Sequence, residues 1–296
     1  MSTYTSMEIC AGAGGQALGL ERAGFEHVSL VEIERPACET LILNRPHWNV
    51  VQADIRQYSG EDYKGIDLFA GGVPCPPFSK AGKQLGSEDE RDLFPEAIRL
   101  VAETKPKAVM LENVRGFLDA VFDGYRTKII KDLGKLGYVA QWKLVNASDY
   151  GVPQLRPRVV FVALKKDLSQ FFEWPVSGLI KPPTVGEALY DLMATNGWQG
   201  ARKWRVAACD IAPTLVGGSK KHGGPDLGPT RAKKAWAALQ VDGMGIANEA
   251  PARDFVGMPR LTVQMAARIQ GFPDDWRFSG KKQRLIGKLA MHFPLR

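Results

Sequence analysis

The chain contains the stretch Met7-Glu8-Ile9-Cys10-Ala11-Gly12-Ala13-Gly14-Gly15, followed by the segment 16–23. The apolar residues predict a strand, the glycines a turn, and the following segment a helix. Glycines let a backbone approach a ligand closely, and the amino terminus of a helix favours anionic groups. The stretch therefore predicts the first strand–turn–helix unit of an α/β fold.

Predicted strands and helices alternate through the rest of the first half. Strands are predicted at residues 28–32, 49–55, 66–70, 108–111 and 158–164, and helices at 94–103 and 124–136. This order is typical of a mostly parallel sheet. Glu32 and Asp54 end two of the strands, where a carboxylate can accept hydrogen bonds from an adenosine-containing ligand. The glycines lack the strict Gly-x-Gly-x-x-Gly spacing of dinucleotide sites, which argues against a dehydrogenase.

The segment Pro74-Cys75-Pro76-Pro77-Phe78-Ser79 presents one cysteine just after the predicted 66–70 strand. Prolines fix the backbone on both sides of Cys75, which suits a thiolate that must be aimed. A structural cysteine usually lies within an apolar periodic segment instead. Because open parallel sheets keep their chemistry at the carboxyl ends of strands, Cys75 is predicted to be a nucleophile. On the hexapeptide alone, a rigid turn remains the alternative.

Composition narrows the class of protein. A chain of 296 residues with 45% hydrophobic and 24% charged residues suits a soluble enzyme of one large or two smaller domains. No run is long enough for a membrane span, and the start lacks the features of a signal peptide. The four cysteines form no Cys-x-x-Cys pair, so neither a zinc site nor a disulfide framework is expected. The net charge of +7 favours a polyanionic partner without establishing one.

Taken together, these segments resemble the C5-cytosine methyltransferases. The motifs occur in the family's order from residue 7 to about residue 282, although Cys10 stands where phenylalanine is common. They are the segments 8–15, 32, 54–55, 74–79, 112–114, 154–158 and 260–274. The resemblance implies an α/β fold, with the Rossmann-like, mostly parallel sheet of an S-adenosylmethionine-dependent methyltransferase and a smaller loop-rich target-recognition domain.

The resemblance also implies domain limits and site residues. Residues 1–171 are expected to form the catalytic and cofactor-binding domain, 172–259 the target-recognition region, and 260–296 a return to the catalytic domain. S-adenosyl-L-methionine is the expected cofactor. Its expected contacts are Cys10, Ala11, Gly12, Gly14, Gly15, Glu32, Ile33, Asp54, Ile55, Pro74 and Leu93. The expected catalytic residues are Cys75, Glu112, Arg156 and Arg158, and no metal is expected.

The chemistry of cytosine requires these residue types. C5 of cytosine cannot take a methyl group from a sulfonium unaided, but addition of a thiolate at C6 creates an enamine that can. A carboxylic acid at N3, here Glu112, relieves the charge that builds on the ring. An arginine at O2 adds fixed positive charge, and Arg158 is the better candidate of the two arginines. A purely structural Glu112–Arg158 ion pair is the alternative.

Double-stranded DNA is the expected partner, and the family flips its target base out of the duplex. The polar segment 80–92 is expected to be a mobile loop that closes over DNA. The expected DNA contacts are Ser79, Lys80, Lys83, Gln84, Ser87, Lys220, Lys221, His222 and Arg231. Ordinary solvated positions are the alternative for each of them. The segment 211–218 resembles a strand of the family's recognition region. Which DNA sequence is recognised does not follow from these residues.

The predicted function is sequence-specific DNA (cytosine-5-)-methylation of the restriction–modification type, in a prokaryotic or phage-derived cytoplasmic enzyme. One alternative is a transfer-RNA cytosine-5 methyltransferase, although Ser79 stands where that group typically has threonine. Another is an incomplete DNA-binding subunit that needs a second polypeptide. This second alternative rests on residues 283–296, which lack the family's last motif but can be back-translated to encode it in a shifted frame. The hypothesis is a frame change near Gln283.

Overall fold

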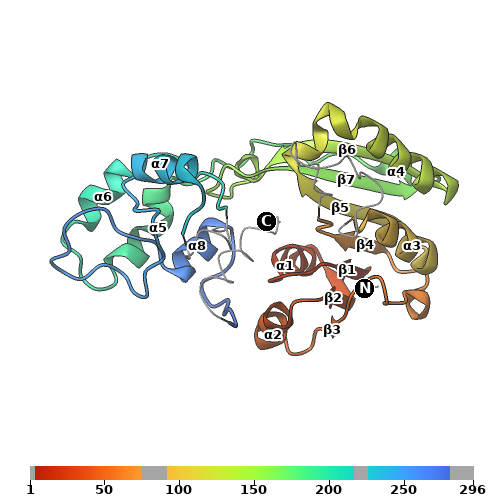
Figure 1. Ribbon diagram of the computed structural model, residues 1–296, viewed down its shortest axis with the longest axis horizontal. Coiled ribbons are helices and arrows are strands. Elements are labelled where there is room, and N and C mark those ends of the chain that lie inside the picture. Colours follow the sequence, from red (N-terminus) through yellow and green to blue (C-terminus); the bar gives the residue numbers. More distant parts are fainter. Residues whose placement is uncertain (1–3, 75–91, 217–225, 281–296) are drawn as a thin grey trace. The chain divides into compact units, whose positions relative to one another are not determined.

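The computed structural model describes residues 4–74, 92–216 and 226–280. These residues form two compact units (Figure 1). The first lies within Met1–Val145 and Pro157–Pro175, and the second within Asn146–Arg156 and Val176–Arg296.

The first unit is built on a seven-stranded sheet with the strand order β3-β2-β1-β4-β5-β7-β6 (Figure 1). The strands are β1 (Tyr4–Ile9), β2 (Phe25–Glu32), β3 (Val50–Gln52), β4 (Leu68–Gly71), β5 (Ala108–Val114), β6 (Tyr138–Asn146) and β7 (Pro157–Lys165). Strands β1 to β5 pair in parallel, whereas β7 runs antiparallel to β5. The predicted mostly parallel α/β sheet is confirmed.

Helices of the first unit connect these strands. They are α1 (Gly15–Arg22), α2 (Arg35–Asn44), α3 (Phe94–Thr104) and α4 (Asp123–Lys135). On one face, the ring nitrogens of His27 bond the Ser6 hydroxyl at 2.8 Å and the Ala17 carbonyl of α1 at 2.9 Å. Met7 points to the other face, because neighbouring strand residues alternate, and joins a core with residues of α3 and α4. The sheet is therefore covered on both faces.

Amphipathic spacing explains α3. Its buried residues are Phe94, Ala97, Leu100, Val101 and Thr104, so they recur every three or four positions along one stripe. That stripe joins the core of the sheet. The charged residues between these positions lie on the opposite side of the helix, where they can form ion pairs and hydrogen bonds.

Two elements of this unit, α2 and β6, have no counterpart among the sequence predictions. Strand β6 lies at the edge of the sheet and only two of its nine residues are buried, so it lacks the continuous apolar run of a buried strand. Helix α2 begins after Glu34 with a proline in its first turn. Short 3₁₀ helices also occur at Glu61–Tyr63, Arg115–Leu118, Ala120–Phe122, Ala147–Asp149 and Ser169–Phe171.

The described part of the second unit contains α5 (Val185–Ala194), α6 (Ala201–Ala207), α7 (Thr230–Ala238) and α8 (Val263–Ile269). The first three helices interrupt the region predicted to be loop-rich. The strand predicted at 211–218 is not formed in its described part, where Ala212 makes an isolated bridge to Gln154. Pro213 lacks the N–H group that would continue a ladder.

Residues 260–280 group with the second unit, although the sequence predicted that 260–296 return to the catalytic domain. Compactness does not test which functional part a segment serves. The predicted division into catalytic and target-recognition regions therefore stays a prediction. The frame change predicted near Gln283 lies outside the described residues.

Candidate functional site

Strand β1 ends in a tight turn with several left-handed backbone conformations. The φ angles are 53° at Cys10, 53° at Gly12 and 87° at Gly14. Such an angle is uncommon for a residue with a side chain, so the turn holds Cys10 in a strained conformation. Gly14, which has no side chain, occupies the N-cap of α1. The first N–H groups of α1, which have no partner within the helix, can therefore face a ligand.

Glu32 at the end of β2 is tied to this turn. Its carboxylate is 7% exposed and accepts the N–H groups of Gly12 at 2.7 Å and Glu34 at 2.8 Å. An ionised carboxylate has about four acceptor positions, so Glu32 keeps capacity for hydroxyl groups such as those of a ribose. Its carbonyl also accepts the N–H of Ala53 at 3.1 Å, which joins β2 to the segment after β3.

That segment carries Asp54 and Ile55. Ile55 is buried, whereas the Asp54 carboxylate is partly exposed and bound by the guanidinium of Arg56 at 2.6–3.0 Å. The hydrogen bonds from Arg56 lower the pKa of Asp54 below its ordinary value. Asp54 is therefore an ionised acceptor held in one orientation.

Two groups in β1 and its turn are kept neutral by burial. Desolvation, followed by the charge of Glu32, raises the pKa of Cys10 to about 12, so this thiol is not a nucleophile at neutral pH. The same two causes raise the pKa of Glu8 well above its ordinary value. Within the described residues the buried Glu8 carboxyl has no hydrogen-bond partner. The sequence analysis missed Glu8, although an acid inside an apolar strand was a usable signal.

Glu112 and Arg158 meet across strands β5 and β7. The antiparallel register places Glu112 opposite Val160 and Arg158 opposite Val114, so both side chains lie on the same face of the sheet. Arg158 Nε lies 2.5 Å from Glu112 Oε1, and each residue is 7% exposed. Burial lowers the pKa of Arg158, while the carboxylate of Glu112 opposes that change. The structure thus brings a carboxyl and a guanidinium together in a nearly dry position.

Asn113 connects this pair to the segment that leads to Cys75. Its Nδ2 donates to the carbonyl of Val73 at 3.0 Å, and its Oδ1 accepts the N–H of Val114 at 2.8 Å. Val73 is two residues before Cys75 in the chain. Cys75 itself lies outside the described residues. Sequence reasoning missed Asn113 as a link between the two motifs that were predicted to be catalytic.

Strand β4 approaches β1 closely just before this segment. A Cβ atom at Gly71 would lie 2.6 Å from Ile9 Cγ1 and 2.8 Å from the Ile9 carbonyl oxygen. Real Cβ atoms do not come so close, so only glycine fits here. The backbone leading to Cys75 therefore starts directly beside the glycine-rich turn of β1.

The other predicted cofactor contacts have varied environments. Ile33 and Pro74 are exposed, while Leu93 is partly buried at the N-cap of α3. Arg156 belongs to the second unit, where it is fully buried and its backbone N–H donates to Asn146 Oδ1 at 2.7 Å. The two predicted catalytic arginines are thus in different units, and Arg158 contacts Glu112.

Among the predicted DNA contacts, the structure describes Arg231, which is exposed on α7. The others lie outside the described residues: Ser79, Lys80, Lys83, Gln84, Ser87, Lys220, Lys221 and His222. The predicted mobile loop 80–92 also lies outside them, except for Asp92.

The described residues contain neither a candidate metal site nor a helix that could span a membrane. Residues 4–74, 92–216 and 226–280 contain no group of three or more His, Cys, Asp or Glu side chains that could hold a metal ion. Over the same residues, each helix is too short or too polar to cross a membrane.

Comparison with known proteins gives a consistent result. The family described as C-5 cytosine-specific DNA methylase matches residues 4–291. Type II methyltransferase M.NgoMIV of Neisseria gonorrhoeae is 60% identical over 294 residues, covering 98% of this chain and 93% of the relative. Type II methyltransferase M.NaeI of Lentzea aerocolonigenes is 52% identical over 300 residues, covering 99% and 72%.

The solved structures agree on the fold. The structure of a Spodoptera frugiperda DNMT2 mutant superposes with a TM-score of 0.70 at 18% identity, covering 99% of this chain and 96% of that chain. At this identity the likeness concerns the fold alone. The family match spans nearly the whole chain, and the two Type II relatives are more than half identical to it. The chain therefore belongs to the C-5 cytosine-specific DNA methylases and is a DNA (cytosine-5-)-methyltransferase of the restriction–modification type.

Proposed function

We propose that this enzyme methylates C5 of a flipped-out cytosine in a specific duplex DNA sequence, through a covalent bond between Cys75 and C6 of the base. The observation that carries the proposal is the buried Glu112–Arg158 pair at 2.5 Å. Asn113 links this pair to Val73, two residues before Cys75. An acid, a guanidinium and a thiol are the groups that this reaction needs.

The residues around the turn of β1 fit S-adenosylmethionine. The left-handed turn of residues 10–14 would let the methionine part approach the first N–H groups of α1, which have no partner within the helix. Glu32 has free acceptor capacity for the ribose. Asp54 and Ile55 would meet the adenine edge. When bound, the cofactor supplies an electrophilic methyl group.

In the first step, the Cys75 thiolate forms a bond to C6 of cytosine. The electrons of the C5–C6 double bond move into the ring, and N3 takes a proton from Glu112, which must have gained one beforehand. C5 thereby becomes a carbon nucleophile that can take the methyl group, the electrons of the methyl–sulfur bond staying on sulfur. Loss of the proton on C5 to solvent then re-forms the C5–C6 double bond as the thiolate of Cys75 leaves C6, and N3 returns its proton to Glu112.

Arg158 supports this sequence in two ways. It holds the Glu112 carboxyl in place before the base arrives, and its fixed charge would stabilise negative charge at O2 of the base. Because both residues are buried, water competes little for either group. The pair is thus arranged to bind the ring edge that carries N3 and O2.

DNA is the substrate that the family match and the Type II relatives support. Both relatives come from bacteria, which supports a prokaryotic or phage-derived enzyme that meets DNA in the cytoplasm. The transfer-RNA alternative remains to be separated by experiment. The comparisons give no support to a second polypeptide, and the proposal does not require one.

The deciding experiment incubates the purified chain with radiolabelled S-adenosylmethionine and either duplex DNA or transfer RNA. Label should enter the DNA at C5 of cytosine and not the RNA. Cys75→Ala should abolish incorporation, and only the wild type should form a covalent complex with duplex DNA that contains 5-fluorocytosine. Incorporation into RNA alone would replace the DNA proposal, and turnover by Cys75→Ala would remove the proposed adduct.

A further inference from the structure

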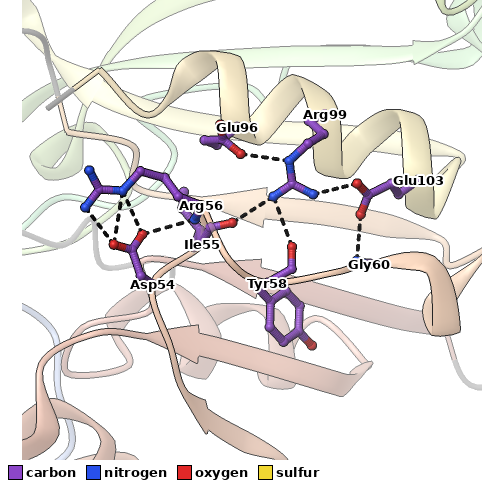
Figure 2. A network of polar contacts seen from close by, with 8 residues as sticks. All are labelled: Asp54, Ile55, Arg56, Tyr58, Gly60, Glu96, Arg99 and Glu103. Carbon is purple, nitrogen blue, oxygen red and sulfur yellow. Dashed lines mark hydrogen bonds and ion pairs between the residues drawn. The ribbon is translucent and has the colours of Figure 1, made fainter. Parts of the chain in front are cut away.

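Arg99 of helix α3 binds the segment that follows β3 (Figure 2). Arg99 Nη2 donates to two backbone carbonyls of this segment, those of Ile55 at 2.8 Å and Tyr58 at 3.0 Å. These carbonyls lie 44 and 41 residues away in the chain. One guanidinium therefore fixes both ends of the turn that starts at Ile55.

The guanidinium of Arg99 is itself fixed by two acids of α3. Nε donates to Glu96 at 2.7 Å, and Nη1 donates to Glu103 at 2.5 Å (Figure 2). Residues three and four positions apart on a helix are neighbours, so both carboxylates can reach the same arginine. With four of its five N–H groups held in these contacts, Arg99 has little freedom to release the two carbonyls.

Glu103 adds a third attachment. Its second oxygen accepts the N–H of Gly60 at 2.8 Å (Figure 2). Gly60 packs so closely on the helix that a Cβ atom there would lie 2.7 Å from Thr104 Cγ2. The Tyr58 hydroxyl also bonds the Ser29 hydroxyl of β2 at 2.8 Å. The segment 55–60 is therefore held to both α3 and the sheet.

We infer that Arg99 and Glu103 are positioning residues that set the adenine-recognising edge of the cofactor site, an inference that rests on the proposed function. Asp54 and Ile55, the residues assigned to adenine, stand at the start of the segment that this network holds. Arg56 fixes only the Asp54 carboxylate, whereas Arg99 fixes the backbone beneath it. A hydrogen bond to the edge of a base tolerates displacements of only a few tenths of an ångström, about 0.5 Å.

The inference predicts an effect on discrimination between purines. Adenine presents an amino group to Asp54, whereas hypoxanthine presents a carbonyl oxygen that the carboxylate repels. Wild type should bind S-adenosylhomocysteine at least about tenfold more tightly than S-inosylhomocysteine. In Arg99→Lys, which keeps the charge but loses the planar set of donors, this preference should fall several-fold. Calorimetric titration of both ligands measures it.

Arg268→Lys is the matched control. Arg268 also donates to a backbone carbonyl, that of Ala188 at 3.1 Å, and pairs with Asp191 and Asp274. It lies in the second unit, so its replacement should lower the melting temperature without changing the purine preference. Glu103→Gln, which keeps an acceptor for Gly60 but weakens the hold on Arg99, should reduce the preference less than Arg99→Lys does.

The outcomes are distinguishable. An unchanged preference in both Arg99→Lys and Glu103→Gln would overturn the positioning role alone, since the wild type would still bind the cofactor product. An equal loss in Arg268→Lys would also overturn it, because general destabilisation would then explain the effect. If wild type bound neither ligand, the proposed function itself would fail. If Arg99→Lys did not fold, the measurement on Glu103→Gln would decide.

Discussion

The sheet of the first unit and the helices α6 and α7 of the second unit carry charge in opposite ways. In the sheet, charged residues are buried at or near the ends of strands: Glu8, Glu32, Glu112 and Arg158. Most of them are held by backbone N–H groups or by each other. Burial and neighbouring groups restrict the orientation of such side chains and shift their pKa values. This environment suits bond making.

On α6 and α7 the basic residues other than the partly buried Lys233 are exposed, and the tryptophans are buried. Trp204 and Trp236 pack inside the unit, and Trp204 Nε1 donates to the carbonyl of Gln240 at 2.9 Å. The exposed basic residues are Arg202, Lys203, Arg205, Arg231 and Lys234. Long, solvated Lys and Arg side chains can contact the phosphate backbone of DNA, and such contacts do not require one fixed side-chain geometry. The comparison indicates that chemistry and DNA affinity are separable, and substitutions can test this.

The largest expected effect is at the buried pair. Glu112→Gln keeps the shape of the side chain but removes the proton donor, so the turnover number should fall by about 10²–10⁴-fold. The dissociation constants of DNA and S-adenosylmethionine should change little. Single-turnover methylation and equilibrium binding measure these quantities.

Arg158→Lys serves as the control for charge at this position. It should retain more activity than Arg158→Ala, because a lysine keeps the positive charge although it loses the planar guanidinium. A near-normal rate in both Glu112→Gln and Arg158→Ala would assign the pair a structural role. It would also show that the buried charges of the sheet do not serve the reaction.

A smaller effect is expected for cofactor binding. Glu32→Gln removes the charge proposed to meet the ribose, and Asp54→Asn removes the charge proposed to meet adenine. Each substitution should therefore weaken S-adenosylmethionine binding by about 10- to 100-fold. DNA binding should change less than about twofold. Glu39→Gln is a matched control, since Glu39 is an exposed acid of α2 paired with Arg35. Equal losses of cofactor and DNA binding would point to damaged folding.

The sequence predicted the positions of the candidate site residues best where these residues follow the ends of strands. Glu32, Asp54 and Glu112 come at or just after the ends of predicted strands, and parallel strands bring their carboxyl ends to one edge of the sheet. Arg158 was found from its motif, but its contact with Glu112 depends on the antiparallel register of β7. The sequence does not display that register directly.

The supporting contacts could not be predicted in the same way. Asn113 bonds a carbonyl 40 residues away, and Arg99 bonds a carbonyl 44 residues away. A backbone carbonyl belongs to every residue type and leaves no mark in the sequence. The helices α5 to α7 were missed because prolines, glycines and basic residues between them hide three short amphipathic segments.

A moderate effect on stability is expected at Glu8. Its pKa is raised in the folded protein, so the folded state binds a proton that the unfolded state releases above the ordinary value of 4.5. The wild type should therefore lose stability as pH rises above 4.5, at up to about 1.4 kcal/mol per pH unit until the folded pKa is reached. Glu8→Gln cannot ionise and should escape this loss.

Urea unfolding of both proteins between about pH 4 and pH 8 measures how the free energy of unfolding changes with pH. The free energies of unfolding should be similar at the acidic end, and the variant should become the more stable protein as pH rises. A constant difference at every pH would show that Glu8 does not change its protonation on folding.

The smallest effect is expected at Arg231 on α7. It is exposed near the amino terminus of the helix, where a positive charge is unfavourable to the helix dipole. The neighbouring Lys233 pairs with Asp226 at 2.6 Å, whereas within the described residues no ion pair is formed by Arg231. Helix stability therefore does not explain this arginine, and a contact with a DNA phosphate would.

Arg231→Ala should weaken DNA binding by only about two- to fivefold near physiological salt, and should lower the slope of log affinity against log salt by about 0.9. Cofactor binding and single-turnover rate on saturating DNA should not change. Lys131→Ala, which removes an exposed charge from α4 of the first unit, should leave the slope unchanged. If both variants lowered the slope equally, overall net charge would explain the effect. If Arg231→Ala slowed the single-turnover step, the separation of chemistry from DNA affinity would fail at this residue.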